Sequence, residues 1–178
     1  MRISGREFFR AFCALFEDRL AIDGNDLVSR LRQKDGRTQW MKCFIGDLAS
    51  RLGSGEVLCQ KEFYNVDFCF WDSRDPWDKM RYRQPLYVLA LIEHENGPNP
   101  EEEFWKLLHW YAPLKVVICY QSWAKLRPYL NSLRSLVGEF LPRSSEEEYL
   151  IIVGELKDAS IEWAGWITTA KDADFTQV

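Results

Sequence analysis

The sequence predicts a single α/β domain, spanning residues 1–178, in which helices flank a mixed central sheet. Residues 86–92 are seven consecutive apolar residues, too few to span a membrane and typical of a strand buried on both faces. A turn, a helical stretch and a second apolar run follow up to residue 120, which is the pattern of a crossover unit joining two parallel strands. Upstream, hydrophobic residues recur at helical spacing before residue 53 and at every second residue after residue 56.

Composition limits the class of protein. A length of 178 residues suits one domain with a sizeable core, and 47% hydrophobic with 15% aromatic residues excludes a disordered chain. The net charge of −4 argues against a protein that coats nucleic acid, but it permits a local basic track. No signal peptide, membrane-spanning run or Cys-x-x-Cys pair is visible, so we expect a cytoplasmic protein without a membrane partner. We expect its five cysteines to be reduced: Cys13, Cys43, Cys59, Cys69 and Cys119.

Three helices are expected before the sheet. Ser4 and Glu7 have the spacing of a capping box, which predicts a helix from residue 5 to about residue 20. A short second helix begins at residues 24–26 and ends near Gly36, and a third runs from Thr38 to about residue 52.

The period of two over residues 64–71 predicts a strand, which carries Asp67 on the same face as Cys69 and Trp71. Whether residues 56–60 form a separate strand that turns at residues 61–62 stays open. Residues 72–84 are a polar connection, which carries the basic residues Arg74, Lys79, Arg81 and Arg83.

Beyond the central strand, Asn99 and Pro100 are expected to begin a helix with an acidic first turn. Its buried side chains are expected to be Phe104, Leu107, Leu108 and Tyr111. A buried strand over residues 114–120, a helix between residues 122 and 140, and a hairpin of residues 149–156 and 160–169 complete the sheet. The last nine residues are expected to fray.

The central strand runs directly into Glu93, His94 and Glu95. Because side chains alternate along a strand, the two glutamates are expected on one side and the histidine on the other. Burying two carboxylates is costly unless they are paired. Either a hard cation, or basic groups such as Arg81, Arg83 or Lys106 together with backbone N–H groups, should therefore meet them. His94 is more typical of a core histidine than of a catalytic base.

The order of elements from Thr38 to Tyr120, with Asp67 on one strand and Glu93-His94-Glu95 on the next, resembles the core of the PD-(D/E)XK, or restriction-endonuclease-like, nuclease superfamily. The resemblance covers about half of the chain, with the N-terminal helices and the C-terminal hairpin as additions. It implies a restriction-endonuclease-like sheet and Mg²⁺-dependent (or Mn²⁺-dependent) cleavage of nucleic acid, with double-stranded DNA as the expected substrate. Two departures are that no proline precedes Asp67 and that Glu95 stands where the family has lysine.

By this resemblance Asp67, Glu93 and Glu95 are the metal ligands, and Mg²⁺ needs only one or two protein carboxylates. Glu95 could also orient or deprotonate the attacking water. Lys106, on the following helix, is the candidate to replace the missing strand lysine, although its spacing from Glu102 also fits an ordinary helical ion pair.

Two alternatives remain open. A catalytically inactive protein of the same fold could act as a protein-binding or regulatory subunit, which the acidic net charge and the missing lysine favour. The acidic cluster could also bind Ca²⁺ or Mn²⁺ for structure alone. Whether the chain forms a homodimer or binds a partner protein is left open.

Overall fold

The computed structural model describes the chain except for residues 54, 75–86, 98, 141–145, 159 and 173. Its helices are α1 (Gly5–Arg32), α2 (Lys34–Leu52), α3 (Pro100–Leu108) and α4 (Trp123–Glu139). Its strands are β1 (Val57–Phe63), β2 (Val66–Asp72), β3 (Val88–Glu95), β4 (Leu114–Tyr120), β5 (Glu148–Leu156), β6 (Ile161–Thr169) and β7 (Thr176–Gln177). The described residues therefore form a mixed α/β fold, as the sequence predicts.

The strands lie side by side in sequence order, β1 to β7, in one sheet. The pairs β1–β2 and β2–β3 are antiparallel, whereas β3–β4 and β4–β5 are parallel. The hairpin β5–β6 and the short β7 add antiparallel strands at the far edge. Because α3 connects β3 to its parallel neighbour β4, the predicted crossover unit is confirmed.

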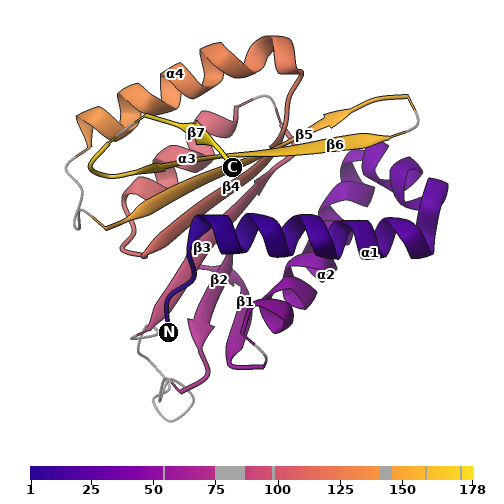
Figure 1. The fold of residues 1–178 in the computed structure, drawn as a ribbon, viewed down its shortest axis with the longest axis horizontal. Helices are drawn as coiled ribbons and strands as arrows, with labels where there is room; N and C mark the ends of the chain where they lie inside the picture. Colours follow the sequence, from indigo (N-terminus) through magenta and orange to yellow (C-terminus); the bar gives the residue numbers. More distant parts are fainter. Residues whose placement is uncertain (54, 75–86, 98, 141–145, 159, 173) are drawn as a thin grey trace.

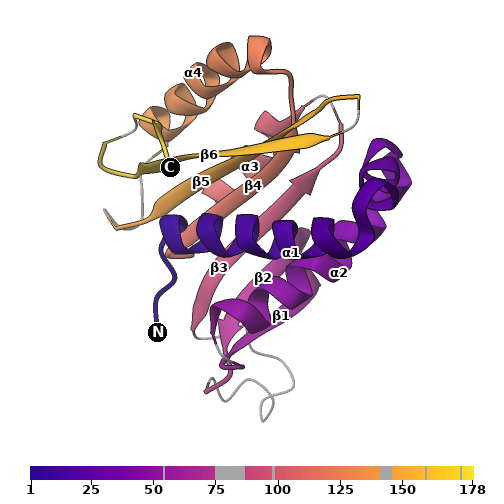
Figure 2. The same ribbon diagram turned by 45° about the vertical axis from the view of Figure 1, so that its right-hand side comes forward.

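Helices cover both faces of the sheet (Figures 1 and 2), with α1 and α2 on one side and α3 and α4 on the other. Alternating side chains divide β3 between the two cores. Ala90 and Ile92 pack under α1 and α2, whereas Leu91 packs under α3 and α4. The central strand is thus buried on both faces, because Leu89 is 2% exposed and Leu91 is 1% exposed.

Replacing Leu91 with alanine is expected to lower the free energy of unfolding by about 2–5 kcal/mol, because the substitution removes buried methyl groups and leaves a cavity. Chemical denaturation measures the change. Ile22→Ala is the control, since Ile22 is 73% exposed and its substitution should stay within about 0.5 kcal/mol. Equal effects at both sites would mean that β3 is not the core strand of the domain.

The N-terminal region has the three expected helical segments, although the first two form one kinked element, α1. The capping box is confirmed, since Ser4 Oγ accepts from the Glu7 amide and Glu7 accepts from the Ser4 amide. The expected start of the second segment is confirmed as well, because α1 is two helices joined at Gly24, whose φ of 50° and ψ of −127° are not helical. The chain then turns toward α2 (Figure 2). The expected break at Gly36 is wrong: this residue lies inside α2, where a Cβ atom would collide with the carbonyl oxygen of Arg30.

The open question about β1 is settled in favour of a separate strand, but the turn lies at Tyr64–Asn65 and not at residues 61–62. Tyr111 was expected to be buried and is instead 57% exposed, because α3 ends at Leu108 and the chain leaves the helical path before residue 111. The last residues do not all fray, since Thr176 and Gln177 pair with Ile167 and Trp166.

All five cysteines are free, as expected, although Cys43 is exposed while Cys69 and Cys119 are buried. Among the described residues, no helix combines the length and the apolar character that crossing a membrane requires.

Candidate functional site

Asp67 and Glu93 lie at the point where the pairing of β2 with β3 ends. The paired residues run from Trp71 and Val88 to Phe68 and Ile92. One residue further on, the two carboxylates reach across between the strands. The Asp67 amide donates to Glu93 Oε2 at 3.3 Å, and the His94 amide donates to Asp67 Oδ2 at 2.9 Å. Two of the three predicted ligands, Asp67 and Glu93, therefore lie together at the end of the antiparallel ladder.

Lys106 approaches Glu93 from α3. Its Nζ lies 3.1 Å from Glu93 Oε1 and also forms an ion pair with Glu103, one turn earlier on the helix. Glu93 is 1% exposed, and its Oε1 lies within ion-pair distance of the ammonium but lacks a well-directed hydrogen bond among the described residues. The lysine is thus a shared counter-ion for two buried or partly buried carboxylates.

The protonation of Glu93 reflects this competition. Burial, with the negative charges of Asp67 and Glu103, raises the pKa of Glu93 to about 8, although Lys106 opposes the shift. The ion pair by itself would favour the carboxylate, but one ammonium shared between two acids does not offset the loss of water around a side chain this buried. Burial also raises the pKa of Glu103, against the pull of Lys106.

Glu95 takes a different position from the one that the resemblance implies. Its Oε1 accepts a hydrogen bond from the amide of Gly97, so the carboxylate is turned toward the loop that follows β3. It still lies close enough for its charge to raise the pKa of Glu103. Among the described residues, no three side chains of His, Cys, Asp or Glu are gathered closely enough to hold a metal ion. Two carboxylates, Asp67 and Glu93, are the pair that the structure brings together.

His94 lies on the opposite face of the sheet, as the alternation predicts. Its Nε2 is 3.3 Å from the hydroxyl oxygen of Tyr120, and the Arg37 guanidinium lies 4.5 Å above the Tyr120 ring. Burial, helped by the charge of Arg37, lowers the pKa of His94 to about 3. His94 is therefore a neutral core histidine, and it does not face the two glutamates.

Of the basic connection after β2, Arg74 is described, and it pairs with Asp72. Lys79, Arg81 and Arg83 lie outside the described residues. Other cations gather at the carboxyl ends of β4 and β5, where Arg37, Lys125 and Lys157 line a hollow of about 600 Å³. This edge of the sheet also holds Glu93 and Glu95, because β3 runs parallel to β4.

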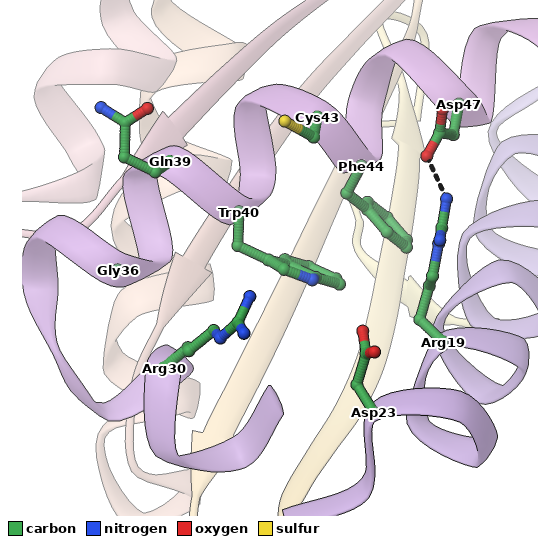
Figure 3. A pocket seen from close by; sticks show the side chains of 9 residues that line it. All are labelled: Arg19, Asp23, Arg30, Gly36, Gln39, Trp40, Cys43, Phe44 and Asp47. Carbon is green, nitrogen blue, oxygen red and sulfur yellow. Dashed lines mark hydrogen bonds and ion pairs between the residues drawn. The ribbon is translucent and has the colours of Figure 1, made fainter. Parts of the chain in front are cut away.

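A further hollow, of about 410 Å³, lies between α1 and α2 (Figure 3). Trp40 and Phe44 point into it, with ring centroids 4.5 Å apart in a stacked arrangement, and Arg19 pairs with Asp47 at its side. Because α1 and α2 cover the face opposite α3, this hollow is separate from the site of Asp67 and Glu93.

Glu103 is the site residue that the sequence analysis missed. Lys106 was matched with Glu102 at a spacing of four, whereas the structure pairs it with Glu103 at a spacing of three. The signal was present in the sequence, because residues three apart also share a helix face. Glu102 is exposed and Glu103 is half-buried, which places only the latter toward the sheet.

A scan against protein-family models finds no match to this chain, and a search of curated proteins finds no relative. The class that the fold defines is a mixed α/β protein, with a seven-stranded sheet over the part of the chain that the structure describes. The function therefore has to be argued from the site.

Proposed function

We propose that this protein is a metal-dependent nuclease of restriction-endonuclease-like fold that hydrolyses DNA, with double-stranded DNA as the expected substrate. The single observation that carries the proposal is the meeting of Asp67 and Glu93 at the end of the β2–β3 ladder, with Lys106 from α3 against Glu93. The resemblance assigns the acids to these positions. The elements from α2 to β4 follow in the order helix, three strands, helix, strand.

The charge at this site favours a divalent cation. With Asp67, Glu93 and Glu103 ionised, the single ammonium of Lys106 leaves two uncompensated negative charges in a partly buried region. A proton or a divalent cation would balance that excess, and the raised pKa of Glu93 reflects the same crowding of negative charge. Carboxylate oxygens are the ligands that Mg²⁺ prefers, and two suffice because the ion keeps several waters.

Asp67 and Glu93 are the residues that would hold Mg²⁺ or Mn²⁺. The bound ion supplies charge stabilisation for the phosphate and lowers the pKa of a coordinated water. With Glu93 committed to a metal ion, the ammonium of Lys106 would be free to stabilise the negative charge on the phosphate. Glu95 would orient or deprotonate the water only after rotating away from the Gly97 amide, to which it is hydrogen-bonded.

Glu93→Gln tests the proposal. For the wild type, metal at ten times its dissociation constant should stabilise the fold by about 1.4 kcal/mol, which is a rise of about 3–6 °C in melting temperature for a chain of this size. Glu93→Gln, nearly isosteric but uncharged, should abolish both that rise and the Mg²⁺-dependent cleavage of duplex DNA. Thermal melts with and without metal and one gel assay measure these effects.

Glu102→Gln is the matched control, because it changes the same charge on the exposed side of α3 and should keep both properties. The proposed nuclease site would be ruled out if Glu93→Gln still cleaved DNA. It would also be ruled out if neither Mg²⁺ nor Mn²⁺ changed the melting temperature of the wild type.

The second candidate is a catalytically inactive protein of this fold that serves as a binding or regulatory subunit. One observation favours it: Lys106 already pairs with Glu93 and Glu103, so the site has an internal counter-ion. This candidate predicts no metal-induced rise in melting temperature and no cleavage by either protein. A structural Ca²⁺ or Mn²⁺ site predicts the rise without the cleavage.

A further inference from the structure

An exposed tyrosine near the candidate site contacts one buried ring and one partly buried ring. Tyr64 is 53% exposed, whereas Phe63 beneath it is 3% exposed. The edge-to-face contact of Tyr64 with Phe63 has a centroid distance of 4.9 Å, and its contact with Trp110 one of 5.8 Å. Phe63 and Trp110 also contact each other at 6.2 Å. The Tyr64 ring is therefore held in place while about half of the side chain still faces water.

The position of Tyr64 near the candidate site follows from the two elements that carry the site. Tyr64 lies in the turn before β2, three residues ahead of Asp67, and Trp110 lies just beyond α3, four residues after Lys106. Phe63 and Trp110 both belong to the core beneath α3 and α4, which is the face that Glu93 and Lys106 share. The contact between Tyr64 and Trp110 thus links the two elements that hold the candidate ligand and the candidate cation.

The backbone of this turn is unusual for an aromatic residue. Tyr64 has a φ of 46° and is followed by Asn65 with a φ of 68°. Asparagine tolerates this left-handed region, but a bulky aromatic side chain rarely adopts it. The buried ring of Phe63, the partly buried ring of Trp110 and the β1–β2 hairpin hold Tyr64 there, so the fold maintains an unfavourable backbone conformation that keeps a ring at the surface.

We propose that Tyr64 is a stacking platform for one unpaired nucleobase of the strand that the candidate site cleaves. The proposal rests on the proposed function and refines it: the substrate is a duplex that is opened at the cleavage point. The Tyr64 ring is 53% exposed, and aromatic rings stack on bases of any sequence. Bases inside an intact duplex are stacked on their neighbours, and they do not present a face to this ring.

Binding measurements test the platform separately from cleavage. The measurement is fluorescence anisotropy in the presence of Ca²⁺, a cation that carboxylate sites bind. It compares the affinity of the protein for a labelled oligothymidylate with its affinity for an oligonucleotide of the same length that lacks its bases. Tyr64→Ala should weaken binding of the oligothymidylate by about 5- to 150-fold and leave the abasic strand unaffected. Tyr64→Phe keeps the ring and should bind as the wild type does.

Tyr111→Ala is the matched control, because Tyr111 is 57% exposed and lies just beyond α3, as Trp110 does. This variant should bind the oligothymidylate as the wild type does. A melting curve establishes that each variant is folded. Unchanged oligothymidylate binding by Tyr64→Ala, or an equal loss on the abasic strand, would overturn the platform while wild-type cleavage still supports the nuclease. A wild type that neither binds nor cleaves any of these nucleic acids overturns both.

Discussion

Replacing Lys115 with methionine is expected to lower the free energy of unfolding by about 3–5 kcal/mol, because it leaves a buried carboxylate without its cation. Lys115 and Glu147 are 2% and 1% exposed, and Lys115 Nζ lies 2.8 Å from Glu147 Oε2. The Tyr149 hydroxyl donates to the same oxygen at 3.0 Å, and it would be the hydrogen-bond donor left to Glu147 in the described structure. Chemical denaturation of the variant measures the loss.

The double variant Lys115→Met/Glu147→Leu separates the cost of a stranded charge from the value of the pair. Because removing both charges also removes both desolvation penalties, it should regain most of the stability lost in the single variant. Arg134→Met, which breaks the exposed pair of Arg134 and Asp174, should cost below about 1 kcal/mol. A double variant as unstable as Lys115→Met would mean that packing, and not charge, holds this end of the sheet.

This pair also shows where prediction from sequence stops. The strand over residues 114–120 is predicted with its bounds, because a run of apolar residues between breakers is a local signal. Lys115 within that run has its partner 32 residues away, in a segment that no local pattern connects to it. Long-range pairing of buried charges depends on the register of β4 with β5, which the sequence alone does not reveal.

The same distinction applies to the candidate site. Alternation places Glu93 and His94 on opposite faces, and the structure confirms it, because the pleat is a property of each strand alone. To predict that Asp67 lies beside Glu93, the pairing of β2 with β3 had to be assumed. The resemblance to the nuclease superfamily suggested that pairing, and no local pattern did. The partner of Lys106 was misjudged, because spacings of three and four both place residues on one helix face and only the sheet decides between them.

Backbone conformation accounts for the remaining differences. The turn at Tyr64–Asn65 has no glycine, yet both residues have positive φ values, as a two-residue hairpin loop requires. At Gly24 the expected helix start is present, and the segment behind it packs back on the same core with Leu27 and Leu31 buried. At the turn, the pairing of β1 with β2 overrides the preference of an aromatic residue for negative φ.

Raising the pH from about 4.5 to about 8 is expected to destabilise the wild type through Glu93. The pKa of Glu93 is raised to about 8 in the folded chain, chiefly by burial, from 4.5. The folded state therefore retains a proton that the unfolded state has lost, so this contribution to stability is complete below pH 4.5 and is lost as the pH passes 8. At about 1.4 kcal/mol per pKa unit, the loss is on the order of a few kcal/mol.

Glu93→Gln isolates this contribution, because glutamine has nearly the same shape and does not titrate. The difference in unfolding free energy between wild type and variant should therefore move in favour of the variant as the pH rises through this window, measured by urea denaturation at several pH values without divalent metal. Added Mg²⁺ should reduce the pH dependence of the wild type alone, because a bound cation favours the carboxylate in place of the proton. A difference that stays constant across the window would show that Glu93 is ionised throughout and that Lys106 alone neutralises it.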